Sequence, residues 1–319
     1  MKRTISILTL ILAINISFGQ VSVKFGINHL VNDEPLTIRS TGENNLANEF
    51  TVSRLQYYIS EIKIVHDADD TTEIEDKYIL VDAFNTTFED LGEYEIDEVK
   101  KVIFSIGVPT PVNNEDPAQW PSEHALAPKF PSMHWGWSAG YRFVAIEGYA
   151  GESFGTKYEY HSLGNDYYFT VEMETQAKMV DGSLVIGVNA EYSDALKDLD
   201  ISKGPILHGE FPDAIKVLEN FRDNVFSSAN GVVSSEWKVT EVPFSIYPNP
   251  SEDGAVIVDI DATDNQLYTI ELIDLTGRKV LTITDIADRR QLQIDQAGSY
   301  LLQIIGEDGF VGTKHLITR

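Results

Sequence analysis

The chain has 319 residues, of which 43% are hydrophobic, and a formal net charge of −26 at pH 7. This length is typical of about two domains, and the charge argues against nucleic acid and anionic membrane surfaces as partners, because both need basic patches. Cysteine is absent, which excludes disulfides, thiolate metal sites, iron–sulfur clusters and cysteine catalysis.

The N-terminus has the pattern of a secretory signal peptide. Lys2 and Arg3 precede an apolar run over residues 5–18, and the small Gly19 stands at the expected cleavage point. The run is short for a membrane span, and no other segment approaches one. We therefore expect a signal peptide over residues 1–19, followed by an exported mature chain with no transmembrane segment.

Short strands separated by polar turns dominate the mature chain. Residues 21–27 alternate apolar and polar side chains, as in a half-buried strand. Similar patterns predict strands over residues 55–65, 78–81, 102–108, 141–146, 158–161, 167–172 and 184–188. One amphipathic helix is predicted over residues 213–226, from the apolar stripe Ile215, Leu218, Phe221 and Val225. These patterns predict an all-β fold of two sandwich-like domains, the larger one with a short helix near its C-terminal end.

The segment over residues 133–143, MHWGWSAGYRF, places His134 directly beside Trp135 and Trp137. A site that combines metal ligation by imidazole with one-electron oxidation of indole needs the two side chains close together. On a strand the two indoles would share one face and His134 the other, so they converge only if the chain turns, which Gly136 permits. The alternative is an aromatic turn that packs at the entry to a buried strand.

The last part of the chain differs in style from the rest, with a boundary near residues 241–243. Residues 244–250, 272–280 and 297–304 supply a Pro-rich entry, a Gly turn between paired strands, and an alternating strand. In motif, order and terminal position this tail resembles the type A C-terminal sorting domain of the Bacteroidota type IX secretion system. The resemblance implies a sorting domain over residues 241–319, handling by the type IX secretion machinery, and release or attachment at the cell surface. An accessory sandwich domain is the alternative.

Six segments of the preceding body follow one another in a characteristic order: residues 50–60, 78–82, 104–108, 133–143, 147–148 and 160–164. In that order they resemble the MbnP-like copper-binding proteins, named for a periplasmic partner in methanobactin operons. The resemblance covers nearly all of residues 20–240 and implies a secreted, β-rich, copper-binding domain. In related methanotroph proteins a tryptophan is oxidised to kynurenine and joins histidines around Cu(I). The resemblance also points to a dihaem tryptophan-oxidising partner.

Histidine and methionine are the donors that Cu(I) prefers when cysteine is absent. His161, at a strand end, and His29, where the family also tends to carry histidine, are the leading expected ligands. His134 and His208 follow as further candidates. Each has the alternative of an ordinary hydrogen-bonding histidine.

Four other residue types near these histidines have candidate roles. Trp135 is the first choice for oxidation to kynurenine and Trp137 the second. Met133 is a candidate axial donor, with core packing as its alternative. Glu147 and Arg142 could form a buried pair that orients a ligand, or a purely structural ion pair.

Motifs of catalysis are missing from the sequence: it has no nucleophile elbow, no phosphate-binding glycine loop and no HExxH zinc helix. We therefore expect a non-enzymatic protein for copper capture or handling outside the cytoplasm. The competing hypothesis is a surface adhesion or glycan-binding module whose aromatic side chains stack on sugar rings.

Overall fold

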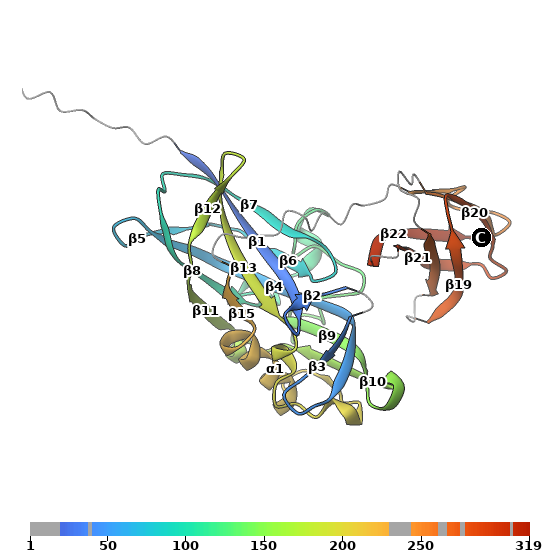
Figure 1. Ribbon diagram of the computed structural model, residues 1–319, viewed down its shortest axis with the longest axis horizontal. Coiled ribbons are helices and arrows are strands. Elements are labelled where there is room, and N and C mark those ends of the chain that lie inside the picture. The colour runs from blue at the N-terminus through green and yellow to red at the C-terminus, as the bar shows by residue number, and fades with distance from the viewer. Residues whose placement is uncertain (1–19, 38–39, 230–243, 261–266, 275–277, 307–308) are drawn as a thin grey trace, which may run out of the picture.

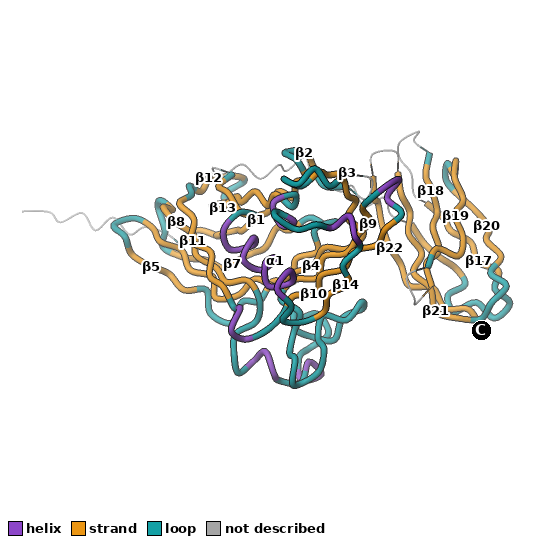
Figure 2. Tube along the Cα trace, turned by 90° about the horizontal axis from the view of Figure 1, so that it is seen from below, coloured by secondary structure: helices purple, strands orange, loops and turns teal. Residues whose placement is uncertain are grey.

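The computed structural model describes residues 20–37, 40–229, 244–260, 267–274, 278–306 and 309–319 (Figure 1). The expected signal peptide and the expected boundary near residues 241–243 lie outside these ranges. Strands dominate the described chain, and its one α-helix is α1 (Pro212–Asp223), so the all-β prediction is confirmed (Figure 2).

Two sheets form the body of the protein. In the described chain, the first has six strands: β1 (Val21–Val31), β2 (Glu34–Pro35), β7 (Thr87–Tyr94), β12 (Ala177–Val180), β13 (Ser183–Glu191) and β15 (Phe226–Ser228). The second has nine described strands: β3 (Thr41–Glu43), β4 (Glu49–His66), β5 (Asp70–Glu73), β6 (Ile79–Asp82), β8 (Val99–Ile106), β9 (Val144–Ala150), β10 (Thr156–Ser162), β11 (Phe169–Glu174) and β14 (Ile206–His208). The sheets share one core, in which Phe25 of β1 meets Phe104 of β8 edge to face at 5.8 Å.

Each strand predicted in the body overlaps a strand of the structure. Strand β7 was missed, because its sequence TFEDLGEY buries few apolar side chains. The expected strand at residue 141 begins later, at Val144, and Tyr141 makes only an isolated bridge to His134.

The predicted helix is confirmed with a different C-terminal end. It begins at Pro212, and proline suits the first turn because the backbone N–H that it lacks would have no partner within the helix there. The helix ends at Asp223 because the chain enters β15 at Phe226. Leu218 and Phe221 of the expected stripe are buried. The helix packs against β10 and β11 of the nine-stranded sheet.

The tail has a hydrophobic core of its own. Its described strands form a three-stranded sheet in the order β16 (Phe244–Tyr247), β17 (Ala255–Ile260) and β20 (Arg289–Gln293). Four more form a sheet in the order β19 (Lys279–Ile286), β18 (Tyr268–Asp274), β21 (Gly298–Gly306) and β22 (Gly309–Thr318). Alternating apolar side chains on these strands bury one face of each sheet, as expected for a small sandwich.

Close packing at Gly148 of β9 gives a test of this arrangement. A Cβ atom there would lie 1.9 Å from the carbonyl oxygen of Thr51 and 2.6 Å from the hydroxyl of Tyr158. The backbone of β4 cannot yield without breaking its pairing with β9, so Gly148→Ala should lower the free energy of unfolding by about 3 kcal/mol. Urea denaturation measures this, with Gly155→Ala as the control, since a Cβ at Gly155 meets only the oxygen of Glu152 at 3.4 Å. Equal stability of the two variants would contradict the packing.

Candidate metal centre

One face of the nine-stranded sheet carries a row of polar side chains near its β14 edge. Along β10, Tyr158 and Tyr160 are fully buried in the core. Because side chains alternate along a strand, Lys157, Glu159 and His161 share the opposite face. The alternation of the local sequence therefore places these three polar residues on one side of β10.

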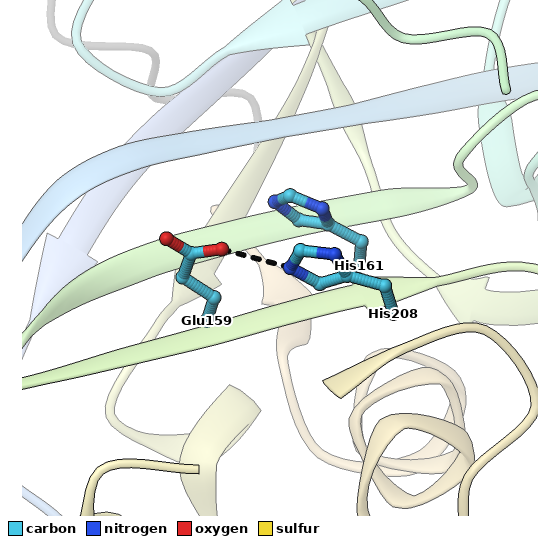
Figure 3. Close-up of side chains that lie close together, drawn as sticks. All are labelled: Glu159, His161 and His208. Atoms are coloured by element: carbon cyan, nitrogen blue, oxygen red, sulfur yellow. Dashed lines mark hydrogen bonds and ion pairs between the residues drawn. The ribbon is translucent and has the colours of Figure 1, made fainter. Parts of the chain in front are cut away.

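Strand register places partners beside this row. β10 pairs parallel with β14, which sets His161 directly opposite His208. β10 pairs antiparallel with β9, which sets Glu159 opposite Glu147, and β9 pairs with β4, which sets Glu147 opposite Arg54. The two imidazoles are consequently stacked, with ring centroids 4.0 Å apart and planes at 16° (Figure 3).

Each imidazole is bound to a carboxylate. Nε2 of His161 lies 2.8 Å from Oε1 of Glu147, which also accepts a hydrogen bond from Arg54 at 2.9 Å. Nε2 of His208 lies 2.8 Å from Oε2 of Glu159 (Figure 3). The other oxygen of Glu159 is paired with Lys157. Burial alone would raise the pKa of Glu147, but the bonds from His161 and Arg54 outweigh it and lower that pKa to about 2. Glu147 is therefore ionised at neutral pH.

His161 is held in the neutral form that binds metals. Burial lowers the pKa of its imidazole, the charges of Arg142 and His208 act in the same direction, and the bond to Glu147 offsets only part of this. Its Nδ1 atom is buried and has no hydrogen-bond partner among the described residues. A buried nitrogen without a partner is costly to a fold, and a metal ion would satisfy it.

Three residues of this face form a group with metal-ligand spacing. Glu159, His161 and His208 each offer a donor atom, and these atoms lie within 4.8 Å of one another. Two imidazoles and a carboxylate, without thiolate, suit copper or zinc, and among divalent first-row metals such donors bind copper most tightly.

The aromatic segment predicted from the sequence folds over this group as a tight hairpin. His134 bridges to Tyr141, the amide of Trp135 donates to the carbonyl of Gly140 at 2.9 Å, and Gly136 takes a φ of +91° that favours glycine. The indole of Trp135 lies edge-on to the His208 ring at 5.6 Å, and the guanidinium of Arg142 lies 5.4 Å from the indole centroid.

Comparisons with known proteins agree with this architecture. The model of the MbnP family matches residues 20–209, which is more than half of the chain. The chain belongs to the MbnP family. The model of the secretion system C-terminal sorting domain matches residues 245–319. A tail of this kind marks an exported protein, secreted or displayed at the cell surface, and the described residues contain no helix able to cross a membrane.

Three solved structures are similar to the chain at low sequence identity. MbnP from Methylosinus trichosporium is 16% identical, with a TM-score of 0.43 over 62% of this chain and 86% of that one. An immunoglobulin-like β-sandwich protein of the duf3244 family from Bacteroides vulgatus is 17% identical, with a TM-score of 0.21 over 25% of this chain and 87% of that one. The BSP domain of a biofilm associated protein is 13% identical, with a TM-score of 0.22 over 96% of this chain and 53% of that one. No curated protein matches significantly.

Of the four histidines that the sequence suggested within this MbnP domain, the structure brings together His161 and His208. His134 contacts Tyr141 instead, with ring centroids 4.8 Å apart, and its Nδ1 accepts a long bond of 3.3 Å from the amide of Gly136. Of the two tryptophans, Trp135 reaches the histidine pair, whereas Trp137 is 73% exposed. The turn at Gly136 therefore separates these side chains rather than converging them.

His29 lies in the six-stranded sheet, away from the group of donors. It is 3% exposed, its Nδ1 shares a hydrogen bond of 2.6 Å with the hydroxyl of Tyr192, and its Nε2 shares one of 3.0 Å with Thr87. Both ring nitrogens are thus already bonded, which leaves no lone pair of this imidazole open to a metal. In this structure His29 has the role of a hydrogen-bonding core residue.

Two further expectations change in the structure. The sulfur of Met133 is buried and accepts a bond from Arg54 at 3.2 Å, so it is not an open donor. The cations paired with Glu147 are Arg54, at 2.9 Å, and Lys157, at 3.9 Å, rather than Arg142. Sequence reasoning missed Glu159, although the alternation of buried tyrosines with Glu159 and His161 was a usable signal.

The buried His29 makes a prediction about acid stability. Burial lowers its pKa from 6.5 to about 3, although a backbone hydrogen bond at Asn85 opposes the shift. Between these two pH values the imidazole of His29 is protonated in the unfolded chain and neutral in the folded chain. The free energy of unfolding is therefore highest above pH 6.5, as far as His29 is concerned, and decreases as the pH falls toward 3. At pH 4.5 the free energy of unfolding should be about 3 kcal/mol lower than at pH 7.5 on account of His29.

Urea unfolding of the wild type and of His29→Gln at both pH values measures the contribution of His29 to the pH dependence of stability. The variant should lose it, whereas His315→Gln, at an exposed position in the tail, should keep the full pH dependence. A variant that retains the wild-type dependence would show that His29 is not the buried neutral residue described.

Proposed function

We propose that this protein is a non-enzymatic copper-binding protein that captures or handles copper outside the cytoplasm. The observation that carries the proposal is the stacked pair His161 and His208, with Glu159 beside it and the Trp135 indole against it. Membership in a family associated with copper and the sorting tail support it.

Cu(I) is the proposed oxidation state. Neutral imidazoles are good donors to Cu(I), and the buried, unpartnered Nδ1 of His161 offers one such lone pair. Three cationic side chains surround the pair, Arg54, Arg142 and Lys157, while Glu147 and Glu159 supply two negative charges. An additional positive charge on the metal is therefore poorly compensated there, which favours the singly charged ion.

Copper affinity of the purified full chain tests this proposal. His161→Ala and His208→Ala should each weaken Cu(I) binding by more than about 100-fold in competition with a chromophoric chelator, which exceeds the effect expected for a residue that only supports a ligand. His124→Ala is the matched control, because that imidazole stacks on Trp120 at 4.2 Å and is outside the donor group. His29→Gln should also bind normally.

Binding in the micromolar range or weaker, unchanged by His161→Ala, would refute the copper proposal. The adhesion or glycan-binding alternative would then gain weight, because Trp137 presents a 73% exposed indole suited to stacking on a sugar ring.

Trp135 is the residue proposed to be oxidised to kynurenine, with a dihaem oxidase as the partner that supplies the oxidising power. Its support is position: this indole lies against His208 and is 44% exposed, so it is reachable from outside and its product would lie beside the ligands. Mass spectrometry of the protein from its native host should find the kynurenine mass in the peptide with residue 135 and fragment ions that place it there. Unmodified Trp135, or modification of Trp137, would contradict this assignment and leave histidine ligation standing.

A further inference from the structure

The two histidines of the pair share an arrangement that determines which nitrogen each can offer. In both cases the nitrogen facing a carboxylate is Nε2, at 2.8 Å: His161 faces Glu147 and His208 faces Glu159. An ionised carboxylate can only accept hydrogen bonds, so each Nε2 must carry the proton. A neutral imidazole has one ring proton, and its Nδ1 therefore keeps a lone pair.

From this geometry we propose that Glu147 and Glu159 are positioning residues, which fix the Nε2–H tautomer of His161 and His208 so that both rings present Nδ1 to the metal. The inference rests on the proposed copper function and specifies how the chain prepares its ligands. It also assigns Glu159 a different role from that of a metal ligand. Both of its oxygens are already engaged, one by His208 and the other by Lys157.

A buried, unsatisfied nitrogen of His161 supports this orientation. Of the two ring nitrogens of His161, Nε2 is bonded and Nδ1 is the one that is buried without a partner among the described residues. The buried His29, by contrast, uses both ring nitrogens, with Tyr192 and Thr87. His161 and His29 thus differ at Nδ1, which is unpartnered in His161 and bonded in His29.

The positioning carboxylates are themselves held. Arg54 donates to Glu147 at 2.9 Å through Nη1 and to the sulfur of Met133 at 3.2 Å through Nη2, and its Nε donates to Gln56 at 2.9 Å. Because Met133 begins the hairpin that carries Trp135, one guanidinium fixes both the carboxylate behind His161 and the loop beside His208. Carboxylates that orient ligating histidines in this way raise the basicity of the ligand, and their loss lowers metal affinity.

The first measurement needs no metal. Two-bond ¹H–¹⁵N correlation spectra of the metal-free protein should show His161 and His208 as Nε2–H tautomers at neutral pH. Glu147→Ala should allow His161 to populate the other tautomer, whereas Glu147→Gln should retain Nε2–H, because the amide oxygen can still accept the bond. On loading with Cu(I), the ¹⁵N shift should change most at Nδ1 of both rings.

The second measurement is copper affinity of the same variants. Glu147→Ala and Glu159→Ala should each weaken Cu(I) binding by about 10- to 100-fold, with partial recovery in the glutamine variants. Glu172→Ala is the matched control, since Glu172 is an exposed residue of β11 paired with Lys101. Thermal unfolding of each variant identifies any loss of fold, and the wild-type tautomers test the proposal even if Glu147→Ala does not fold.

The two proposals fail in different ways. Nδ1–H tautomers in the metal-free wild type, a copper shift at Nε2, or wild-type affinity in Glu147→Ala would overturn the positioning role while copper binding stands. A wild-type protein with Nε2–H at both rings that binds no copper would instead overturn the proposed function.

Discussion

The partly buried charge of Glu147 is the constraint on which the rest of the site depends. An ionised carboxylate removed from water costs several kcal/mol unless it is fully bonded, and the fold meets this need with the guanidinium of Arg54 and the imidazole of His161. These residues come from β4, β9 and β10, so one charge ties three neighbouring strands together at fixed register. The row of polar side chains follows from that register.

The same constraint explains how an aromatic hairpin comes to lie over a histidine pair. Arg54 cannot leave Glu147 without exposing a buried charge, and its second donor group reaches Met133 at the base of the hairpin. This contact restrains the position of the hairpin, and the turn at Gly136 places Trp135 beside His208 and Arg142. Electrostatics in the sheet thus positions an indole in a loop.

Sequence patterns predicted the strands because a half-buried strand must alternate in polarity, and this requirement is local. They also drew attention to His161, because it stands at the end of a predicted strand. The pairing of His161 with His208 was not accessible, because it depends on a parallel register between strands far apart in the chain, and β14 is too short to show any period. His29 has the same sequence signature, a histidine toward the end of a strand, but belongs to the other sheet.

The tryptophans show where local reasoning stops. Alternation along an extended strand would place Trp135 and Trp137 on one face, but the chain reverses between Trp135 and Tyr141, and the two indoles have different surroundings. A glycine allows a turn, but whether the turn forms depends on the bonds that the residues on either side of it can make. Here the flanks bond to each other, through His134 and Tyr141, and the turn follows.

The chemistry of the donors agrees with the destination of the chain. A sorting tail sends this protein out of the cell, where thiols are prone to oxidation, and the chain contains no cysteine. Imidazole and carboxylate groups do not undergo thiol oxidation, so a site built from them keeps its donors in an oxidising compartment. Imidazoles lack the negative charge of a thiolate, so in such a site they must be neutral and correctly oriented in order to bind a metal. Burial supplies the neutrality of His161, and carboxylates at Nε2 supply the orientation of both rings. A cysteine-free copper site therefore depends more heavily on its supporting carboxylates than a thiolate site would.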